Sequence, residues 1–255
     1  MTFLYTAENR VGQQFTGRGA WHDDGVPASF VRFRRFLIAG ALVAVLSVPA
    51  ATLLAQTATS APAQHRPTST PYTGDLSIFE TPGRDARLHI DRVMDILAIA
   101  PGKTVADIGA GSGWFTVRAA KRVGSAGRVY AVDINPAALQ YIDERVHKDR
   151  IENVKTIAGK GDNPELPPDT IDAVLLLKTY HEVAEPIALL RNLRAALRPG
   201  ARVGIIDRDG NGEDHGVHKL IVLREANEAG YRLLEEHDDL VKEDHVDYFL
   251  VLGVK

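Results

Sequence analysis

The chain has 255 residues, of which 45% are hydrophobic and 25% charged, enough for one α/β domain of ordinary size plus an appendage. The absence of cysteine excludes disulfides, thiolate metal sites and a cysteine nucleophile. Residues 1–74 contain six of the 30 basic residues but only three of the 33 acidic residues, so the remainder is acidic. An acidic domain without a cluster of basic and aromatic residues argues against nucleic acid as a partner.

Residues 1–35 form an N-terminal extension with a basic end, and an uncharged apolar run over residues 36–55 follows Arg34 and Arg35. This order is typical of an export signal, and the run is also long enough for an uncleaved membrane anchor. Either interpretation predicts an exported domain, periplasmic or attached to the membrane through 36–55. A cytoplasmic domain is expected if the segment is not used. The alternative of a buried core helix is disfavoured because the run is apolar all round and lacks caps.

Residues 56–76 are rich in threonine, serine, proline, alanine and glutamine, which predicts a disordered linker before a domain over residues 77–255. We therefore expect a chain without residues 1–70 to fold. The segment from Tyr72 to Glu80 is the candidate for a lid over a ligand pocket.

Apolar periodicity predicts alternating strands and helices through the domain. Helices are expected over 86–99, 112–123, 136–148, 185–198 and 217–229, and strands over 104–108, 128–133, 153–158, 171–177 and 202–207. Such alternation predicts a parallel sheet with helices on both faces. The strand-like runs over 231–236 and 248–254 are joined by a loop too short for a crossover helix, so a hairpin is expected.

A glycine-rich turn joins the first predicted strand to the next helix within the stretch TVADIGAGSGWF, residues 104–115. Glycines at this place bring backbone close to a ligand, and the N-terminus of the helix favours an anionic group by about 0.3–1 kcal/mol. The dinucleotide pattern G-x-G-x-x-G is absent, because Trp114 stands where its last glycine would be. The spacing therefore disfavours NAD.

The strand over 128–133 ends in Asp133, where a carboxylate that binds ribose hydroxyls is needed. With the D-x-G-x-G-x-G pattern that starts at Asp107, the chain resembles the class I S-adenosylmethionine-dependent methyltransferases from about Ser77 onward. The resemblance includes Gly161-Asp162, the strand over 171–177 and Leu197-Arg-Pro-Gly200. It implies a doubly wound, mostly parallel seven-stranded sheet with helices on both faces and a reversed C-terminal strand.

The resemblance implies S-adenosylmethionine as the cofactor, bound by residues that follow the first four predicted strands. These residues are Asp107, Gly109, Ala110, Gly111, Gly113, Asp133, Ile134, Asp162 and Lys178. Asp133 is expected to accept both ribose hydroxyls, and Asp162 to face the adenine amino group. The alternative for Asp162 is a solvated loop acid, because the motif around it is short.

The acceptor is expected beyond the fourth strand, beside Tyr180, His181 and Glu182. Methyl transfer from a sulfonium depends mostly on positioning, and a base adds about 10²–10⁴ in rate when the acceptor must lose a proton. His181 is the candidate base, with Tyr180 and Glu182 as further catalytic candidates. The alternative is a histidine that only hydrogen-bonds backbone. Other residues that could face the acceptor are Asp207, Arg208, His215 and His218; their spacing fits no standard metal pattern, so no metal is predicted.

The sequence thus predicts methyl transfer to a small-molecule acceptor, whose identity it does not specify. The first alternative is a module that binds S-adenosylmethionine or another nucleotide without catalysis, since an exported domain would meet little donor outside the cytoplasm. The second is an NAD(P)-dependent oxidoreductase, which the glycine spacing disfavours.

Overall fold

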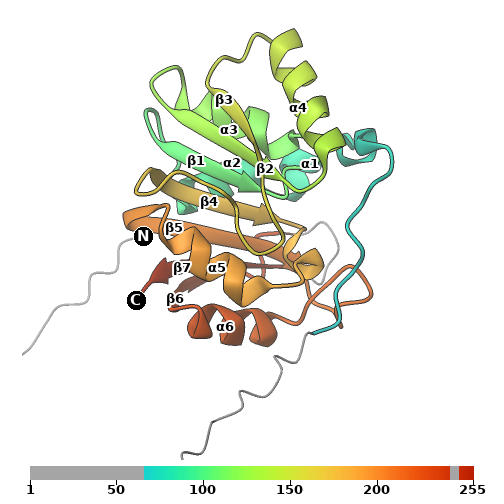
Figure 1. Cartoon of the computed structure of the whole chain (residues 1–255), viewed down its shortest axis with the longest axis vertical. Coiled ribbons are helices and arrows are strands. Elements are labelled where there is room, and N and C mark those ends of the chain that lie inside the picture. Colours follow the sequence, from blue (N-terminus) through green and yellow to red (C-terminus); the bar gives the residue numbers. More distant parts are fainter. Residues whose placement is uncertain (1–65, 242–246) are drawn as a thin grey trace, which may run out of the picture. The chain divides into compact units, whose positions relative to one another are not determined.

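A computed structural model describes residues 66–241 and 247–255 of the chain (Figure 1). The apolar run over 36–55, with its predicted role as signal or anchor, lies outside these residues. Of the helices within the described ranges, none combines the length and the apolar character that a membrane span requires.

A seven-stranded sheet runs through the described residues in the order β3-β2-β1-β4-β5-β7-β6. Its strands are β1 (Thr104–Ile108), β2 (Arg128–Asp133), β3 (Val154–Ala158), β4 (Ile171–Leu177), β5 (Leu197–Arg208), β6 (Tyr231–Glu236) and β7 (Asp247–Val254). Strands β1 to β5 pair in parallel, while β7 is antiparallel to both β5 and β6. The predicted seven-stranded sheet with a reversed C-terminal strand and its hairpin are therefore confirmed.

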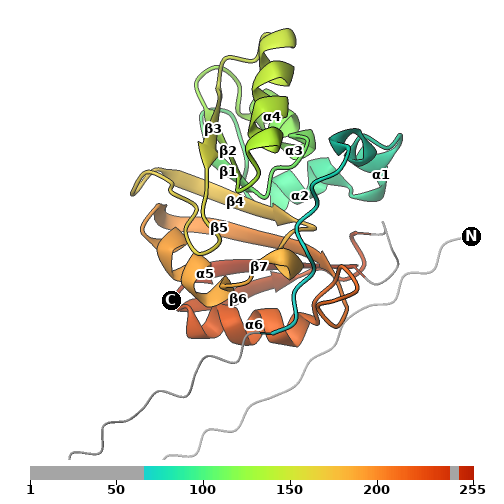
Figure 2. The ribbon, with the colours of Figure 1, turned by 45° about the vertical axis from the view of Figure 1, so that its right-hand side comes forward.

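Helices cover both faces of this sheet, as predicted (Figures 1 and 2). They are α1 (Arg84–Arg87), α2 (Ile90–Ile96), α3 (Trp114–Val123), α4 (Pro136–Lys148), α5 (Pro186–Arg194) and α6 (Lys219–Glu228), with the 3₁₀ turns η1 (Leu76–Phe79) and η2 (Tyr180–Glu182). Side chains of α2 and α3 pack in one buried cluster, and side chains of α5 and α6 pack in another. The two clusters lie on opposite faces of the sheet.

The central strand β4 is buried on both faces because successive side chains of a strand point in opposite directions. Leu175 belongs to the cluster with α2 and α3, whereas Leu176 belongs to the cluster with α5 and α6, and both are fully buried. A continuous apolar run of this kind is typical of a parallel strand covered by helices. The strand therefore holds the two helical layers together and fixes the position of the residues that follow it.

Several element boundaries differ from the sequence prediction; the helix expected over 185–198, for example, ends at Arg194, and three of the differences have local reasons. The helix expected over 86–99 is divided into α1 and α2, because His89 adopts a left-handed conformation with φ 46°. Helix α3 begins at Trp114 rather than at residue 112, because Gly113 precedes it with φ 72°. Strand β5 begins at Leu197, since its first residues also pair with β4 before a register shift.

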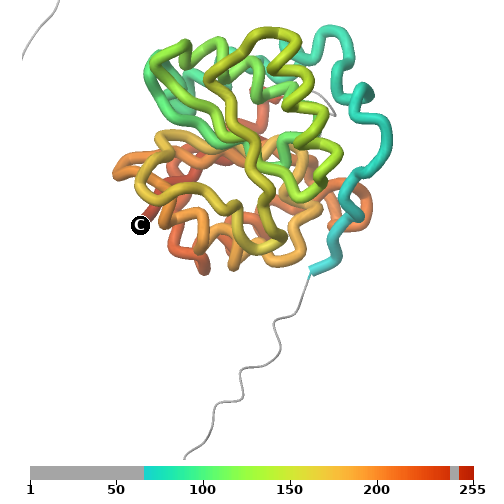
Figure 3. Tube along the Cα trace, turned by 45° about the horizontal axis from the view of Figure 1, so that its top comes forward, coloured from blue at the N-terminus to red at the C-terminus, as the bar shows by residue number. Residues whose placement is uncertain are grey.

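Residues 66–80, here called the N-terminal strap, lie against the domain from α6 to α4 (Figure 3). At one end, the guanidinium of Arg66 forms an ion pair of 3.1 Å with the carboxylate of Glu225 in α6. At the other end, the Glu80 carboxylate forms an ion pair with Arg145 in α4. This arrangement differs from the linker expected over residues 56–76. The prediction rested on the low content of apolar residues, and residue composition does not reveal that one arginine side chain is buried in an ion pair.

Candidate functional site

A cavity of about 680 Å³ lies at the carboxyl ends of β1, β2 and β4, beneath the strap. Ligands of open α/β sheets bind at this edge. Backbone and side chains of the glycine turn form one wall, and Glu182 in η2 lies on another. The strap contributes the residues Thr68, Ser69, Thr70, Pro71, Tyr72, Thr73, Leu76 and Phe79. The segment proposed as a lid, Tyr72 to Glu80, thus provides part of the cavity wall.

Two glycines of the turn, Gly109 and Gly111, present bare backbone to the cavity, whereas Gly113 lies outside its lining. Gly109, Gly111 and Gly113 have φ values of 73°, 54° and 72°, the left-handed region that favours glycine. A Cβ atom at Gly109 would lie 2.2 Å from the Thr179 hydroxyl oxygen. At Gly111 the nearest atom would be a ring carbon of Phe79 at 3.7 Å, so backbone conformation and the adjoining cavity, rather than a clash, favour glycine there.

Asp133 lies in the cavity wall at the carboxyl end of β2, as predicted from the sequence. Its Oδ2 accepts a hydrogen bond of 2.9 Å from the Gly111 backbone N–H, and its Oδ1 accepts one of 2.9 Å from Asn135. These bonds hold the carboxylate still, and each oxygen keeps a lone pair for a further donor. Its contact with ribose hydroxyls stays a prediction.

Asp107 is buried beneath the glycine turn, with 2% of its surface exposed. The Thr116 hydroxyl donates a hydrogen bond of 2.6 Å to its Oδ2. Burial raises the pKa of Asp107 to about 7, and the nearby charge of Asp133 acts in the same direction. The carboxyl is therefore partly protonated near neutral pH, and a cationic ligand group in the cavity would favour its charged form.

The other predicted cofactor residues fall into two groups. Ala110, Ile134 and Lys178 line the cavity, and Ile134 offers an apolar surface that is 53% exposed. The Lys178 ammonium forms an ion pair with Asp247 at the start of β7. Asp162 is exposed and does not belong to the lining, and its backbone carbonyl accepts a hydrogen bond from Asn192. Its placement agrees with the alternative of a solvated loop acid.

Tyr180 is a core residue rather than a neighbour of the acceptor, contrary to its prediction as a catalytic candidate. Its side chain is fully buried, and its hydroxyl donates a hydrogen bond of 2.9 Å to Glu225. A 3₁₀ turn has three residues per turn, so successive side chains diverge by about 120°. In η2 this divergence sends Tyr180 into the core and leaves Glu182 in the cavity wall.

His181 is oriented by a fully buried carboxylate. Its Nδ1 lies 2.8 Å from Oδ1 of Asp207. The same carboxylate accepts a backbone hydrogen bond from His181 at Oδ2 and one from Arg208 at Oδ1. In a neutral imidazole this contact places the proton on Nδ1 and leaves the Nε2 lone pair free. Contrary to the sequence expectation, Asp207 does not face the cavity; it lies behind His181, where it supports the ring.

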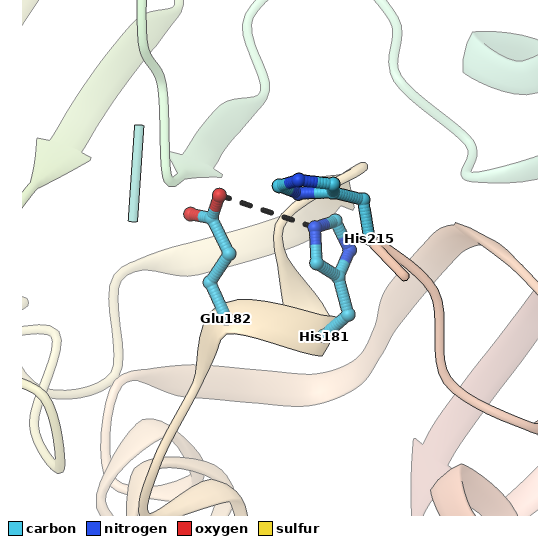
Figure 4. Close-up of side chains that lie close together, drawn as sticks. All are labelled: His181, Glu182 and His215. Atoms are coloured by element: carbon cyan, nitrogen blue, oxygen red, sulfur yellow. Dashed lines mark ion pairs between the residues drawn. The ribbon is translucent and has the colours of Figure 1, made fainter. Parts of the chain in front are cut away.

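Glu182 and His215 lie beside the free nitrogen of His181 (Figure 4). The Glu182 Oε1 is 3.9 Å from Nε2 of His181, and the two imidazole centroids are 5.8 Å apart at 89°. Burial raises the pKa of Glu182 to about 7, although the charge of His181 opposes this shift. His218 lies apart from this group, since its Nδ1 accepts a hydrogen bond from Leu220 at the start of α6.

Known proteins resemble this chain mostly in its central part. Residues 105–200 match the family described as "Methyltransferase domain". An arsenite methyltransferase of Halobacterium salinarum is 31% identical over 136 residues, which are 53% of this chain and 35% of that protein. A demethylmenaquinone methyltransferase of a Geobacillus species is 28% identical over 110 residues, 43% of this chain and 47% of that protein. The chain thus spans less than half the length of these curated relatives.

Solved structures extend the similarity to the whole fold. A S-adenosylmethionine-dependent methyltransferase from Aquifex aeolicus is 25% identical with a TM-score of 0.64, covering 72% of this chain and 100% of that chain. A [4+2]-cyclase shares the fold at 15% identity with a TM-score of 0.55, covering 74% of this chain and 86% of that chain. The second likeness concerns the fold alone, and it illustrates that one fold carries different chemistry.

Proposed function

Because the chain belongs to the class I S-adenosylmethionine-dependent methyltransferases, we propose that it methylates a small molecule that binds over Glu182 and His181. The observation that carries this proposal is one cavity that joins the glycine turn and Asp133 to Glu182. Donor and acceptor can therefore bind in the same cavity, so the methyl group can pass directly from one to the other. The acidic charge balance, with a sequence pI of about 6.3, agrees with a small molecule rather than nucleic acid.

The donor end suits S-adenosylmethionine in charge and in shape. Asp133 offers carboxylate lone pairs to ribose hydroxyls, and Ile134 offers an apolar surface to the adenine ring. Asp107 supplies negative charge for a cationic donor, while the N-terminus of α3 favours the donor carboxylate. Bound S-adenosylmethionine supplies a methyl group already activated on a sulfonium, so the protein's main task is alignment.

At the acceptor end, Glu182 lines the cavity, and His181 lies outside the lining with its Nε2 lone pair 3.9 Å from the Glu182 carboxylate. Transfer of the methyl group from a bound donor would break its bond to sulfur and would leave S-adenosylhomocysteine as a neutral thioether, so the acceptor must lose a proton to the protein. The acceptor proton passes to Nε2 of His181, while Asp207 stabilises the resulting imidazolium through Nδ1. Glu182 stands beside the same nitrogen and holds the acceptor hydroxyl.

The lining favours an acceptor with an apolar body. Tyr72 and Leu76 of the strap and Val183 beyond η2 line the same cavity, in which Phe79 lies over the glycine turn. The relatives are named for arsenite and for a quinone precursor, which belong to different chemical classes. Arsenite prefers thiolate ligands, and this chain has no cysteine. We therefore propose an organic acceptor with an apolar ring or chain and an ionisable hydroxyl group.

Residues 36–55 add a proposal about location, supported by their sequence alone. A basic stretch followed by an uncharged apolar run is the order of an export signal or anchor, which would place the domain outside the cytoplasm. A reporter fused behind residues 31–70 tests the proposal. A reporter that stays in the cytosol, whether or not Arg34 and Arg35 are present, would remove it.

Calorimetry and turnover test the proposed activity separately. Titration of the protein with S-adenosylmethionine, S-adenosylhomocysteine and NADH should give binding of the first two only. Hydroxylated aromatic compounds are then screened for release of S-adenosylhomocysteine. Donor binding without turnover across a broad screen would favour the non-catalytic module. Binding of NADH in place of the donor would reject the proposed cofactor.

A further inference from the structure

We propose that His181, Glu182 and His215 form a binding site for one divalent transition-metal ion of the zinc type. One ligand atom from each side chain lies within 4.8 Å of those of the other two. The ligands come from η2 after β4 and from the loop after β5, so the sheet brings together residues that the sequence separates (Figure 4). The sequence predicts no metal because known metal patterns depend on ligands at short, fixed spacings, and His215 lies 33 residues beyond Glu182.

The distances need only a small inward movement of side chains. With bond lengths of about 2.1 Å, two ligand atoms of a tetrahedral ion stand about 3.4 Å apart. The pair from Nε2 of His181 to Oε1 of Glu182 is already at 3.9 Å. His215 is exposed, and the side chain of Glu182 is 20% exposed, so both can rotate toward an ion while His181 stays fixed.

Asp207 gives His181 the support that metal-binding histidines have. A ligating imidazole usually donates its other N–H to a carboxylate or carbonyl, which fixes the tautomer and the direction of the free nitrogen. Here the contact from Nδ1 of His181 to Asp207 is 2.8 Å, and Asp207 is fully buried. The second nitrogen therefore points its lone pair toward the two other ligands rather than into the core.

Ser69 of the strap ties the two ligand-bearing segments to each other. Its backbone N–H donates to the His181 carbonyl at 3.3 Å, and its hydroxyl accepts from the His215 backbone N–H at 3.0 Å. His215 has φ 58°, which non-glycine residues adopt mainly where surrounding contacts impose it, often at functional sites. The loop is thus held in the position that brings His215 to His181.

The charges around the cluster also suit a cation. Asp207 and Glu182 bring two carboxylates into a region with little exposure to water, and buried negative charge requires compensation. The guanidinium of Arg66 donates to the His181 carbonyl at 3.3 Å, but it forms its ion pair with Glu225 at 3.1 Å. A divalent ion bound to His181 would balance both carboxylates of the cluster.

Two imidazoles and one carboxylate are the ligand set of catalytic zinc sites that keep a fourth position open. Of the three ligands only Glu182 lines the cavity, so an ion bound beside it would lie at the cavity wall next to the proposed acceptor. This consequence rests on the proposed function: the ion would bind the acceptor oxygen, and Nε2 of His181, now a ligand, would no longer act as base. Ion binding itself does not depend on the proposed function.

Metal titration of the untagged full chain tests the site without donor or acceptor. After treatment with chelator, calorimetry should find one Zn²⁺ per chain, and Co²⁺ should give the intense visible bands of a tetrahedral complex with nitrogen and oxygen ligands. Mg²⁺ should not compete, because it prefers oxygen ligands. Absence of stoichiometric Zn²⁺ binding, or equal binding of Mg²⁺, would overturn the proposal.

Variants assign the ion to these residues. His215→Ala and Glu182→Gln should each lower Zn²⁺ affinity at least about 10–100-fold, the effect known for supporting residues, and Asp207→Asn should lie within that range. His147→Ala, which removes an exposed histidine from the last turn of α4, is the matched control and should bind normally. Unchanged affinity in both His215→Ala and Glu182→Gln would reject the site. Donor affinity measured in parallel shows whether the proposed function fails separately.

Discussion

The donor end of the cavity consists largely of backbone from consecutive residues, whereas the acceptor end consists of side chains from three separate segments. At the donor end, residues 107–113 make the turn, and Asp133 fastens it through the Gly111 N–H. At the acceptor end, η2, the loop after β5 and the strap meet through Asp207 and Ser69. Changes at the donor end should therefore alter donor affinity, and changes at the acceptor end should alter turnover or stability.

The largest effect is expected from Gly111→Val. A Cβ in a backbone with φ 54° strains the turn, and the added side chain enters the cavity beneath Phe79. Donor binding measured by calorimetry should be lost while circular dichroism still reports a folded domain. Gly124→Val is the control, because Gly124 has φ 66° and open space around its Cβ position, far from the cavity lining. Equal donor affinity in both variants would break the comparison.

His181→Ala should lower turnover and leave donor affinity nearly intact. The rate with a known acceptor is expected to fall about 10²–10⁴-fold, while donor affinity stays within a factor of about two. If His181 is the base, the acidic limb of the pH–rate profile disappears in the variant. If it is a metal ligand, the bound Zn²⁺ is lost as well. Normal turnover at low and at saturating acceptor would make the histidine a bystander.

Arg66→Ala should lower stability more than it lowers donor affinity. Side chains of Arg66 and Glu225 are 8% and 7% exposed, and removal of one partner of a buried ion pair costs about 3–5 kcal/mol. The free energy of unfolding in urea measures this loss. Shortened chains should differ because of this ion pair: a chain without residues 1–60 should match the parent, whereas one without residues 1–70 should be less stable. Equal stability of the two shortened chains would contradict the role of the strap.

Asp133→Ala should weaken the donor by well over tenfold. Hydrogen bonds to a charged group contribute about 1.5–3 kcal/mol each, and the variant also frees the Gly111 N–H that fastens the turn. Asp162→Ala is the matched control, an exposed acid outside the cavity lining, and should bind the donor as the parent does. A larger loss in Asp162→Ala than in Asp133→Ala would reverse the assignment of these two acids.

The last prediction is a slope of stability with pH. Because burial raises the pKa of Asp107 to about 7, the folded domain holds a proton that the unfolded chain releases near its ordinary value of 3.8. This contribution to stability is present below pH 3.8 and is lost as pH rises toward 7, at up to about 1.4 kcal/mol per pH unit. Urea unfolding of the ligand-free protein should show it, and Asp107→Asn should flatten the curve. Identical slopes in the two proteins would place Asp107 in a more polar environment.

The contrast between the two ends also explains what the sequence predicts. The glycine turn and Asp133 follow consecutive predicted strands, and each residue type suits its local backbone or ligand contact. Their positions in the cavity wall could therefore be predicted from the order of the strands along the chain. Tyr180 was misplaced because orientation in a 3₁₀ turn depends on which side chain the core accepts. The grouping of His181 with Asp207 and His215 requires the register of β4 against β5. The position of the strap depends on the buried side chain of Arg66, and no pattern in the neighbouring sequence predicts that this side chain is buried.

Strand β7 has a consequence for synthesis of the protein. It follows β6 in the chain but lies between β5 and β6, so β5 has no neighbour on that side until β7 has left the ribosome. Its side chains are almost entirely buried, and an uncovered β5 would present an open strand edge. Pairing over such a sequence separation is slow. We therefore expect the nascent chain to be prone to aggregation as long as the edge of β5 is unpaired. The ion pair between Asp247 and Lys178 can form only once β7 has paired with β5.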